Sequence, residues 1–324
     1  MNHPQRPIRF GTGGGRVSDR DRLVAAARRA EDIGYSTFSM SDHFGLPLAP
    51  LIALQAVADA TTTLRITQTV LGQDFRQPAV LAKELATLDV LSDGRVDIGL
   101  GAGWMRSEYD QAGIRFDPAT LRIARLEEVV IVLKGLFGDQ PFSFSGHHVT
   151  ITDLNGTPKP VQRPHPPILI GGGGLQLLGV AARQADIIQV MPRIRPPSQP
   201  IDAREFIADT YRAKVDHIKT IAGKRFHEIE LGTQLLLAAV TDDSDRVLAE
   251  FLAGFGAIYG RPGAQLALSD DNLRASPLVA VGSLSEVCDK LLATRDEFGI
   301  SYFMCPIGAK PSSLAPIISR LAGT

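Results

Sequence analysis

Short apolar runs alternate along the chain with longer segments in which apolar residues recur at helical spacing. The clearest example lies between Leu64 and Trp104, which reads LRITQTVLG, then QDFRQPAVLAKELATLDVLSDG, then RVDIGLGAGW. The first and third pieces have the apolar, β-branched character of buried strands, and the middle piece has helical spacing and ends at Gly94. A strand, a helix and a strand in this order predict a βαβ unit with parallel strands and a right-handed crossover.

The same alternation continues on both sides of this unit and predicts an α/β protein. The predicted strands are residues 8–12, 35–40, 64–71, 95–100, 168–170, 185–191, 229–240 and 301–307. Helical patterns separate most of these strands, as they do in a (β/α)8 TIM barrel. We expect one such barrel domain over residues 1–324, with a hairpin-like excursion at 142–151 and an irregular insertion at 256–277.

Composition narrows the class of partner. The 324 residues carry a net charge of −1 with a pI near 6.7, and 44% of them are hydrophobic and 21% charged. This balance argues against nucleic acid or an anionic membrane as the main partner and favours a small-molecule substrate. No apolar run reaches membrane-spanning length, the first residues lack an apolar leader, and Cys288 and Cys305 lack metal-ligand or CxxC spacing. We therefore expect a cytoplasmic protein without a metal site.

Polar residues follow two of the predicted strands at their carboxyl ends, which form the catalytic face of a barrel. Asp42 and His43 follow the second strand, where an imidazole can serve as an acid, a base or a hydrogen-bond donor near neutral pH. The alternative is a structural role in which His43 packs against Phe44 and bonds to Asp42. Thr69 and Val70 end the third strand, and by composition alone they are ordinary strand residues.

Two glycine-rich segments follow later strands. The GAGW segment of residues 101–104 leaves the backbone open to close approach by a flat ring, although Trp104 could alternatively pack in the core. Residues 171–174 are four glycines before a helix, where free N–H groups and the helix dipole favour a bound phosphate. A tight turn is the alternative. If phosphate binds there, a bulky residue at Gly173 should weaken binding while the fold survives.

The sequence contains no GxSxG elbow, HExxH motif or P-loop, so the difficult chemistry belongs to a cofactor. Several separated motifs indicate the kind of cofactor. SDHF, PAVLAKELATLDVLSDGRVDIGLGAGW, RIARLEEVVIVLKGLF, PKPVQRPHPPILIGGGG and AARQADIIQV occur in an order that resembles the luciferase-like monooxygenase superfamily of flavin- and deazaflavin-dependent (β/α)8 barrels. The resemblance covers roughly residues 8–190. SDHF followed by TVLGQDFRQPAV is most similar to members that use coenzyme F420.

The resemblance to F420-dependent members implies a role for each candidate. It implies that His43 and Asp42 are a catalytic pair beside the deazaflavin ring, and that Thr69–Val70 is a non-proline cis peptide behind the ring. It places GAGW around the ring, the glycines on the phosphate, and Arg193 and Arg195 of the next loop near the acidic tail. The implied cofactor-binding residues are Asp42, His43, Thr69, Val70, Gly101, Ala102, Gly103, Trp104, Gly172, Gly173 and Gly174. Relatives are commonly dimers, so we expect a homodimer.

The chain departs from the F420-dependent glucose-6-phosphate dehydrogenases that it otherwise resembles. Residues 45–47 stand where those enzymes have a Trp, Trp104 replaces a catalytic Glu, and residues 13–15 replace an acidic residue. We therefore expect hydride transfer between F420 and an organic, fairly apolar substrate rather than a sugar. One alternative is an FMN-dependent monooxygenase that uses O2 and reduced flavin from a separate reductase. The other is a non-catalytic flavin-binding relative.

Overall fold

The computed structural model describes residues 5–194, 199–258 and 265–324. Each predicted strand region contributes one strand to a single parallel sheet. These strands are Arg9–Gly13 (β1), Thr37–Met40 (β2), Arg65–Gln68 (β3), Val96–Gly101 (β5), Ile168–Gly172 (β8), Ile187–Val190 (β9), Glu230–Gln234 (β10) and Ile300–Met304 (β13). A further short strand, Leu71–Gly72 (β4), follows β3 and pairs with β5.

The sheet closes on itself into a barrel. Its strand order is β3-β2-β1-β13-β10-β9-β8-β5-β4, and β3 also pairs with β5. The register sets Phe10 opposite Phe303 and Phe38 opposite Ile66, and all four side chains belong to the main hydrophobic core. Because the strands are covered by helices, they read as apolar runs rather than alternating ones. The predicted (β/α)8 barrel is confirmed.

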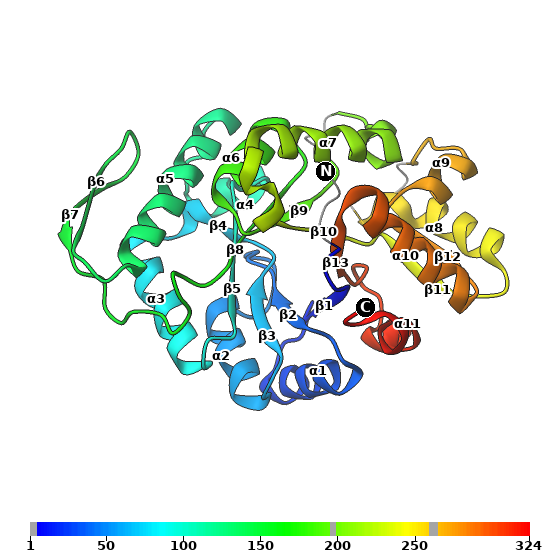
Figure 1. Ribbon diagram of the computed structural model, residues 1–324, viewed down its shortest axis with the longest axis horizontal. Coiled ribbons are helices and arrows are strands. Elements are labelled where there is room, and N and C mark those ends of the chain that lie inside the picture. The colour runs from blue at the N-terminus through cyan, green and yellow to red at the C-terminus, as the bar shows by residue number, and fades with distance from the viewer. Residues whose placement is uncertain (1–4, 195–198, 259–264) are drawn as a thin grey trace.

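Helices surround the barrel (Figure 1). They are Arg20–Ile33 (α1), Pro50–Ala60 (α2), Pro78–Leu91 (α3), Arg106–Ala112 (α4), Ala119–Phe137 (α5), Leu175–Gln184 (α6), Ala208–Ala222 (α7), Ser244–Ile258 (α8), Asp270–Ala275 (α9), Leu284–Phe298 (α10) and Ala315–Leu321 (α11). Short 3-10 turns occupy Gln73–Phe75, Ala203–Phe206, Gly223–Glu228 and Pro311–Leu314. Local sequence sets the bounds: in α1, Asp19 accepts the Arg22 N–H at the start, and left-handed Gly34 ends the helix. No helix in the described ranges is both long and apolar enough to cross a membrane.

An antiparallel hairpin lies outside the barrel. Its strands are Phe142–Ser145 (β6) and Thr150–Leu154 (β7), as the alternation around Gly146 predicts. The hairpin projects beyond α5 at the left of Figure 1. Glu128 of α5 accepts the backbone N–H groups of residues 147–149 at 2.8 to 2.9 Å, which fixes the base of the hairpin turn to the helix.

The C-terminal third differs from the prediction in one strand. Residues 229–240 do not form a single strand, because Leu237–Val240 (β11) leaves the barrel and pairs with Val279–Gly282 (β12). Leu235 and Leu236, at the break, are both buried. The apolar run therefore continues across the break, and hydrophobicity alone does not reveal it.

The segment 256–277 is not irregular throughout, as the sequence pattern suggested. Helix α8 extends to Ile258, and α9 occupies Asp270–Ala275. The Ser269 side chain accepts the N–H of Asn272 and so begins α9. A helix this short shows too few apolar positions for its period to be recognised.

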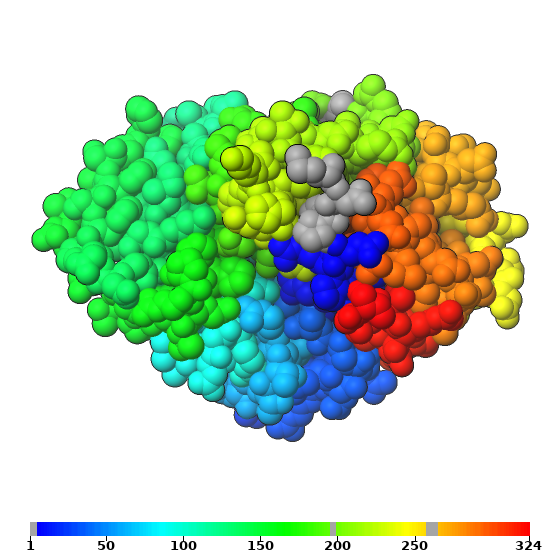
Figure 2. All heavy atoms as spheres, in the orientation of Figure 1, coloured from blue at the N-terminus to red at the C-terminus, as the bar shows by residue number. Residues whose placement is uncertain are grey.

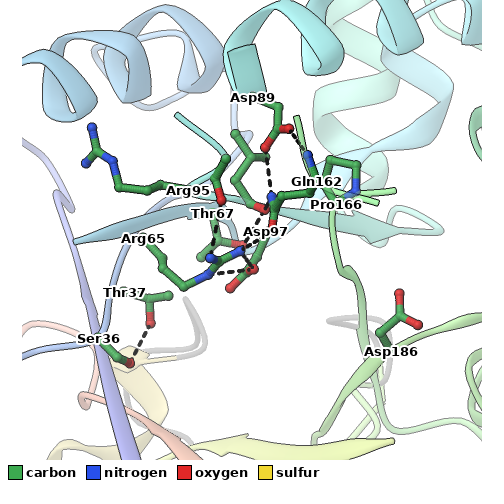
Figure 3. A network of polar contacts seen from close by, with 12 residues as sticks. Ser36, Thr37, Arg65, Thr67, Asp89, Arg95, Asp97, Gln162, Pro166 and Asp186 are labelled. Carbon is green, nitrogen blue, oxygen red and sulfur yellow. Dashed lines mark hydrogen bonds and ion pairs between the residues drawn. The ribbon is translucent and has the colours of Figure 1, made fainter. Parts of the chain in front are cut away.

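Charged side chains fill the amino-terminal end of the barrel. Arg9 donates to Glu230 from Nε and Nη2, each at 2.7 Å, and Arg65 donates to Asp97 at 2.6 and 3.0 Å. Asp97 is 1% exposed, and Arg65 also reaches Gln162 at 2.9 Å (Figure 3). This end lies opposite the catalytic face of a TIM barrel, where residues contribute to stability rather than to chemistry.

The two ends of the described chain meet beside β1. The N–H of Ile8 donates to the carbonyl of Thr324, and the N–H of Gly323 donates to the carbonyl of Ile8, both at 2.9 Å. Figure 2 shows the blue N-terminal segment against the red C-terminal residues on this face. The last helix, α11, is thereby fastened to the first barrel strand.

Candidate active site

The Thr69–Val70 peptide lies directly after β3, at the carboxyl end of the barrel. The bond is cis, which confirms the prediction made for it, and both residues are partly exposed. The Ser41 hydroxyl donates to the Thr69 carbonyl at 3.3 Å, so the SDHF loop and this peptide are adjacent. A Cβ on Gly101 would lie 2.4 Å from Val70 Cγ2, so glycine is what allows β5 to pass this close.

Asp42 braces the turn after β3 and does not hydrogen-bond to the imidazole. Its carboxylate accepts two bonds from Arg76, at 2.6 and 3.1 Å, and one from a backbone N–H of β4 at 3.0 Å. The alternative in which Asp42 bonds to His43 is therefore wrong, because the two parallel donors of a guanidinium match a carboxylate better. Phe44 packs against Phe75 instead, with ring centroids 4.9 Å apart.

His43 pairs with Glu108 of α4. Its Nδ1 lies 2.8 Å from Glu108 Oε2, and its ring meets Trp104 edge to face with centroids 5.9 Å apart. Glu108 is 7% exposed. Trp104 is 49% exposed, so the alternative in which Trp104 packs in the core is wrong. Within the described residues, His43 Nε2 has no hydrogen-bond partner. Sequence reasoning missed Glu108, 65 positions away, although an acidic residue in the first turn after a barrel strand is a usable signal.

Arg122 of α5 holds the segment that follows β5. Its Nε donates to the carbonyl of Ala102 at 3.0 Å, and its Nη2 donates to the carbonyl of Gly103 at 3.2 Å. The guanidinium carbon lies 3.9 Å from the centroid of the Phe116 ring. Burial is the main reason that the pKa of Arg122 lies below its ordinary value. The GAGW segment is thus fixed through its backbone, which leaves the Trp104 side chain free to face outward.

A second arginine of α5 joins two carboxylates near the site. Arg125 pairs with both Asp74 and Asp117, and Asp74 accepts the hydroxyl of Tyr109 at 2.9 Å. The hydrogen bond from Arg125 is the main cause that lowers the pKa of Asp117, whereas burial, followed by the nearby Asp74 charge, raises the pKa of Tyr109. Gly103 has φ 73°, and a Cβ there would lie 1.8 Å from the Tyr109 hydroxyl, so only glycine fits.

The glycine run of residues 171–174 ends β8 and leads into α6, as the sequence predicts. β8 ends at Gly172, and Gly174 is the N-cap of α6 with no side-chain hydrogen bond to the helix. A Cβ on Gly174 would meet nothing within 4 Å. A Cβ on Gly173 would lie 2.3 Å from the carbonyl oxygen of Met191 and 2.5 Å from the N of Arg193. The expectation that the fold survives a bulky residue at Gly173 is therefore wrong, because backbone fills that space.

The loop after β9 is anchored by a buried lysine. Lys214, 3% exposed, donates to the carbonyl of Met191 at 2.8 Å and to Glu205 at 2.6 Å, and burial lowers its pKa. The N–H of Arg193 donates to the same carboxylate at 2.9 Å, while the Arg193 side chain is exposed. Arg195 lies outside the described residues. Arg193 is held through its backbone, and its exposed side chain adds no hydrogen bond to the site among the described residues.

Comparison with known families gives a match over residues 6–301 to the family described as luciferase-like monooxygenase. The chain belongs to this family. The matched range contains all the candidate site residues, from the SDHF loop to the glycine run. The luciferase-like frame therefore covers the whole carboxyl end of the barrel described above.

The names of two curated relatives of this luciferase-like chain state different cofactors. An FMNH2-dependent dimethylsulfone monooxygenase from Pseudomonas putida is 30% identical over 219 residues, which are 64% of this chain and 56% of that protein. An F420-dependent glucose-6-phosphate dehydrogenase from Amycolatopsis mediterranei is 34% identical over 173 residues, which are 51% of each protein. The chain thus spans about half the length of these relatives.

A solved luciferase-like structure has the same fold. The coenzyme F420-dependent tetrahydromethanopterin reductase from Methanopyrus kandleri matches with a TM-score of 0.76 and 18% identity, and the match covers 98% of each chain. At this identity the likeness concerns the fold. Luciferase-like proteins are oxidoreductases or monooxygenases, which supports an enzymatic role for this chain.

Proposed function

We propose that the protein is an F420-dependent oxidoreductase that transfers hydride between coenzyme F420 and an organic, fairly apolar substrate. One observation carries the proposal: the hydrogen bond from Ser41 to Thr69, which sets the SDHF loop beside the Thr69–Val70 peptide. These two segments hold the motifs that resemble the F420-dependent branch of the family. The 34% identity to an F420-dependent dehydrogenase over 173 residues adds support.

The residues at this end of the barrel fit such a cofactor. Val70 lies between two glycines: the Cβ position of Gly101 is 2.4 Å from Val70 Cγ2, and that of Gly171 is 3.7 Å from Val70 Cγ1. Glycine at both positions makes room for the Val70 side chain, and the partly exposed Thr69–Val70 peptide offers a surface for a flat ring. The N–H groups at the start of α6, beyond Gly174, have no side-chain cap and can receive a phosphate.

His43 would move the proton that accompanies the hydride. The bound cofactor supplies the hydride acceptor or donor. When an alcohol is oxidised, its O–H bond breaks, the proton passes to His43 Nε2, and the neighbouring carbon gives up a hydride and becomes a carbonyl carbon. Reduction of a carbonyl runs the other way, with the proton returned from Nε2. Trp104 and Phe44, 49% and 57% exposed beside His43, favour an apolar substrate.

An FMN-dependent monooxygenase is the second candidate. The match to the dimethylsulfone monooxygenase favours it, because that match covers 64% of this chain against 51% for the dehydrogenase. Trp104, in place of the Glu of the sugar-oxidising enzymes, also agrees with a different reaction. This candidate needs O2 and a separate source of reduced flavin.

Turnover without oxygen tests the proposal. Purified protein is mixed with oxidised or reduced F420 and with panels of apolar secondary alcohols and ketones under nitrogen, and the F420 spectrum is followed. We expect oxygen-independent turnover that falls by about 10²-fold or more in His43→Ala, since general acid–base groups contribute this much. F420 affinity should change little, because stacking and backbone contacts would hold the ring. A strict requirement for reduced FMN and O2 would favour the monooxygenase.

A further inference from the structure

Helix α4 ties together loops from different strands. Glu108 bonds to His43, after β2, at 2.8 Å, and the next residue, Tyr109, bonds to Asp74, after β4, at 2.9 Å. Asp74 in turn pairs with Arg125 of α5. The short helix is therefore held on two sides, and the Glu108 carboxylate has a fixed position next to the imidazole.

The bond to Glu108 determines which nitrogen of His43 faces outward. A carboxylate accepts the hydrogen bond, so in the neutral imidazole Nδ1 would carry the proton and Nε2 would keep its lone pair. The edge-to-face contact with Trp104 at 5.9 Å restrains the plane of the ring. The His43 side chain is 30% exposed and that of Glu108 is 10% exposed, so the carboxylate lies on the inner side of the pair. Without Glu108, the ring could turn over and present its other edge.

We propose that Glu108 is the positioning residue for His43, holding Nδ1 protonated so that Nε2 faces the substrate. The inference rests on the proposed function, which supplies the reaction. In the oxidation of an alcohol, the O–H bond breaks and an N–H bond forms at Nε2, while the bound cofactor would supply the acceptor for the hydride of the neighbouring carbon. The imidazolium that results keeps its Nδ1–H bond to Glu108. Asp42 cannot take this part, because its oxygens bond to Arg76 and to a backbone N–H.

The tautomer of His43 tests the proposal without any substrate. The full chain is labelled with nitrogen-15 histidine and its imidazole signals are recorded near pH 9, where an ordinary imidazole with a pKa of about 6.5 is neutral. The spectrum of His43→Ala identifies the signals. We expect Nδ1–H in the native protein and in Glu108→Gln, whose side-chain oxygen still accepts, and Nε2–H in Glu108→Leu. Asp110→Asn, which removes an exposed carboxylate from α4, is the matched control and leaves the signals unchanged.

A native His43 protonated at Nε2, or a Glu108→Leu spectrum identical to the native one, would overturn the proposal. Turnover gives its second readout: Glu108→Leu lowers kcat by roughly 10- to 100-fold at unchanged F420 affinity, and Glu108→Gln restores most of it. Native kcat in Glu108→Leu also overturns the role. If the tautomers are as expected but the native protein turns over only with FMN and O2, the proposed function fails and the positioning of His43 by Glu108 stands.

Discussion

Three glycines at the mouth of the barrel illustrate how one residue type takes different roles. Gly101 lets β5 pass beside Val70, and Gly173 lets the turn after β8 pass against the backbone after β9. Gly174, by contrast, has open space where a Cβ would be. Its φ of −82° and ψ of 137° suit any residue, so sterics alone do not require glycine at this position.

At Gly174, valine should separate phosphate binding from folding. The branched side chain would stand over the first N–H groups of α6 without meeting the protein. We expect Gly174→Val to weaken F420 binding about tenfold, or ~1.4 kcal/mol, with a nearly unchanged thermal midpoint. Gly173→Val, where backbone fills the space, should lower the midpoint markedly. Native F420 affinity in Gly174→Val would favour the alternative in which the glycine run is only a tight turn.

Single-residue contacts could be predicted only in part. The cis Thr69–Val70 bond was predicted from the resemblance, since nothing in the composition of two ordinary strand residues indicates it. The partner of His43 was not predicted, because Glu108 is 65 positions away and only the folded barrel brings the two loops together. The neighbour in sequence, Asp42, seemed the natural partner but satisfies Arg76 instead.

Arg122 of helix α5 fixes the backbone of the GAGW segment, and the contribution of these hydrogen bonds to stability can be measured. Arg122→Leu removes the donors that hold the carbonyls of Ala102 and Gly103, so we expect a loss of ~2 kcal/mol in unfolding free energy. Trp104, the only Trp of the chain, should change its emission as the segment loosens. Arg115→Leu, at an arginine whose side chain is 87% exposed, is the control with little effect. Unchanged emission and stability in Arg122→Leu would show that the GAGW segment keeps its conformation without Arg122.

Elements were predicted best where helix and strand periods alternate clearly. The first six barrel strands lie within two residues of their predicted starts, because short apolar runs between amphipathic helices leave little freedom of assignment. Residues 229–240 were merged into one strand because the break at Leu235 and Leu236 is as apolar as its flanks. The partner strand β12 was missed, since its pairing with β11 depends on a turn out of the barrel that no local pattern marks.

The two ends of the barrel have different roles. Candidate chemistry lies at the carboxyl ends of the strands. The amino ends hold the ion pairs of Arg9 with Glu230 and Asp97, and the ion pair of Arg65 with Asp97 (Figure 3). Such a division is general in TIM barrels, where loops at one end carry the chemistry and the other end contributes stability. The two ends should therefore respond independently to mutation.

Asp97→Asn tests this independence. The change leaves Arg65 and Arg9 without a carboxylate that is 2% exposed, so we expect a loss of roughly 3 kcal/mol, near the lower end for breaking a buried ion pair. F420 affinity should stay native. Glu127→Gln, which breaks a partly exposed pair with Arg183, should cost less than about 1 kcal/mol. Urea unfolding and F420 binding measure both properties, and a parallel loss of affinity in Asp97→Asn would contradict the division.

The central claim, that this barrel is built for F420, is tested most directly by comparing two affinities in one preparation. F420 and FMN are titrated separately into the purified protein, with quenching of Trp104 emission as the signal and equilibrium dialysis as the check. We predict that F420 binds at least about tenfold more tightly than FMN, a difference of ~1.4 kcal/mol or more. Equal affinities, or tighter binding of FMN, would contradict the account and favour a flavin-dependent monooxygenase.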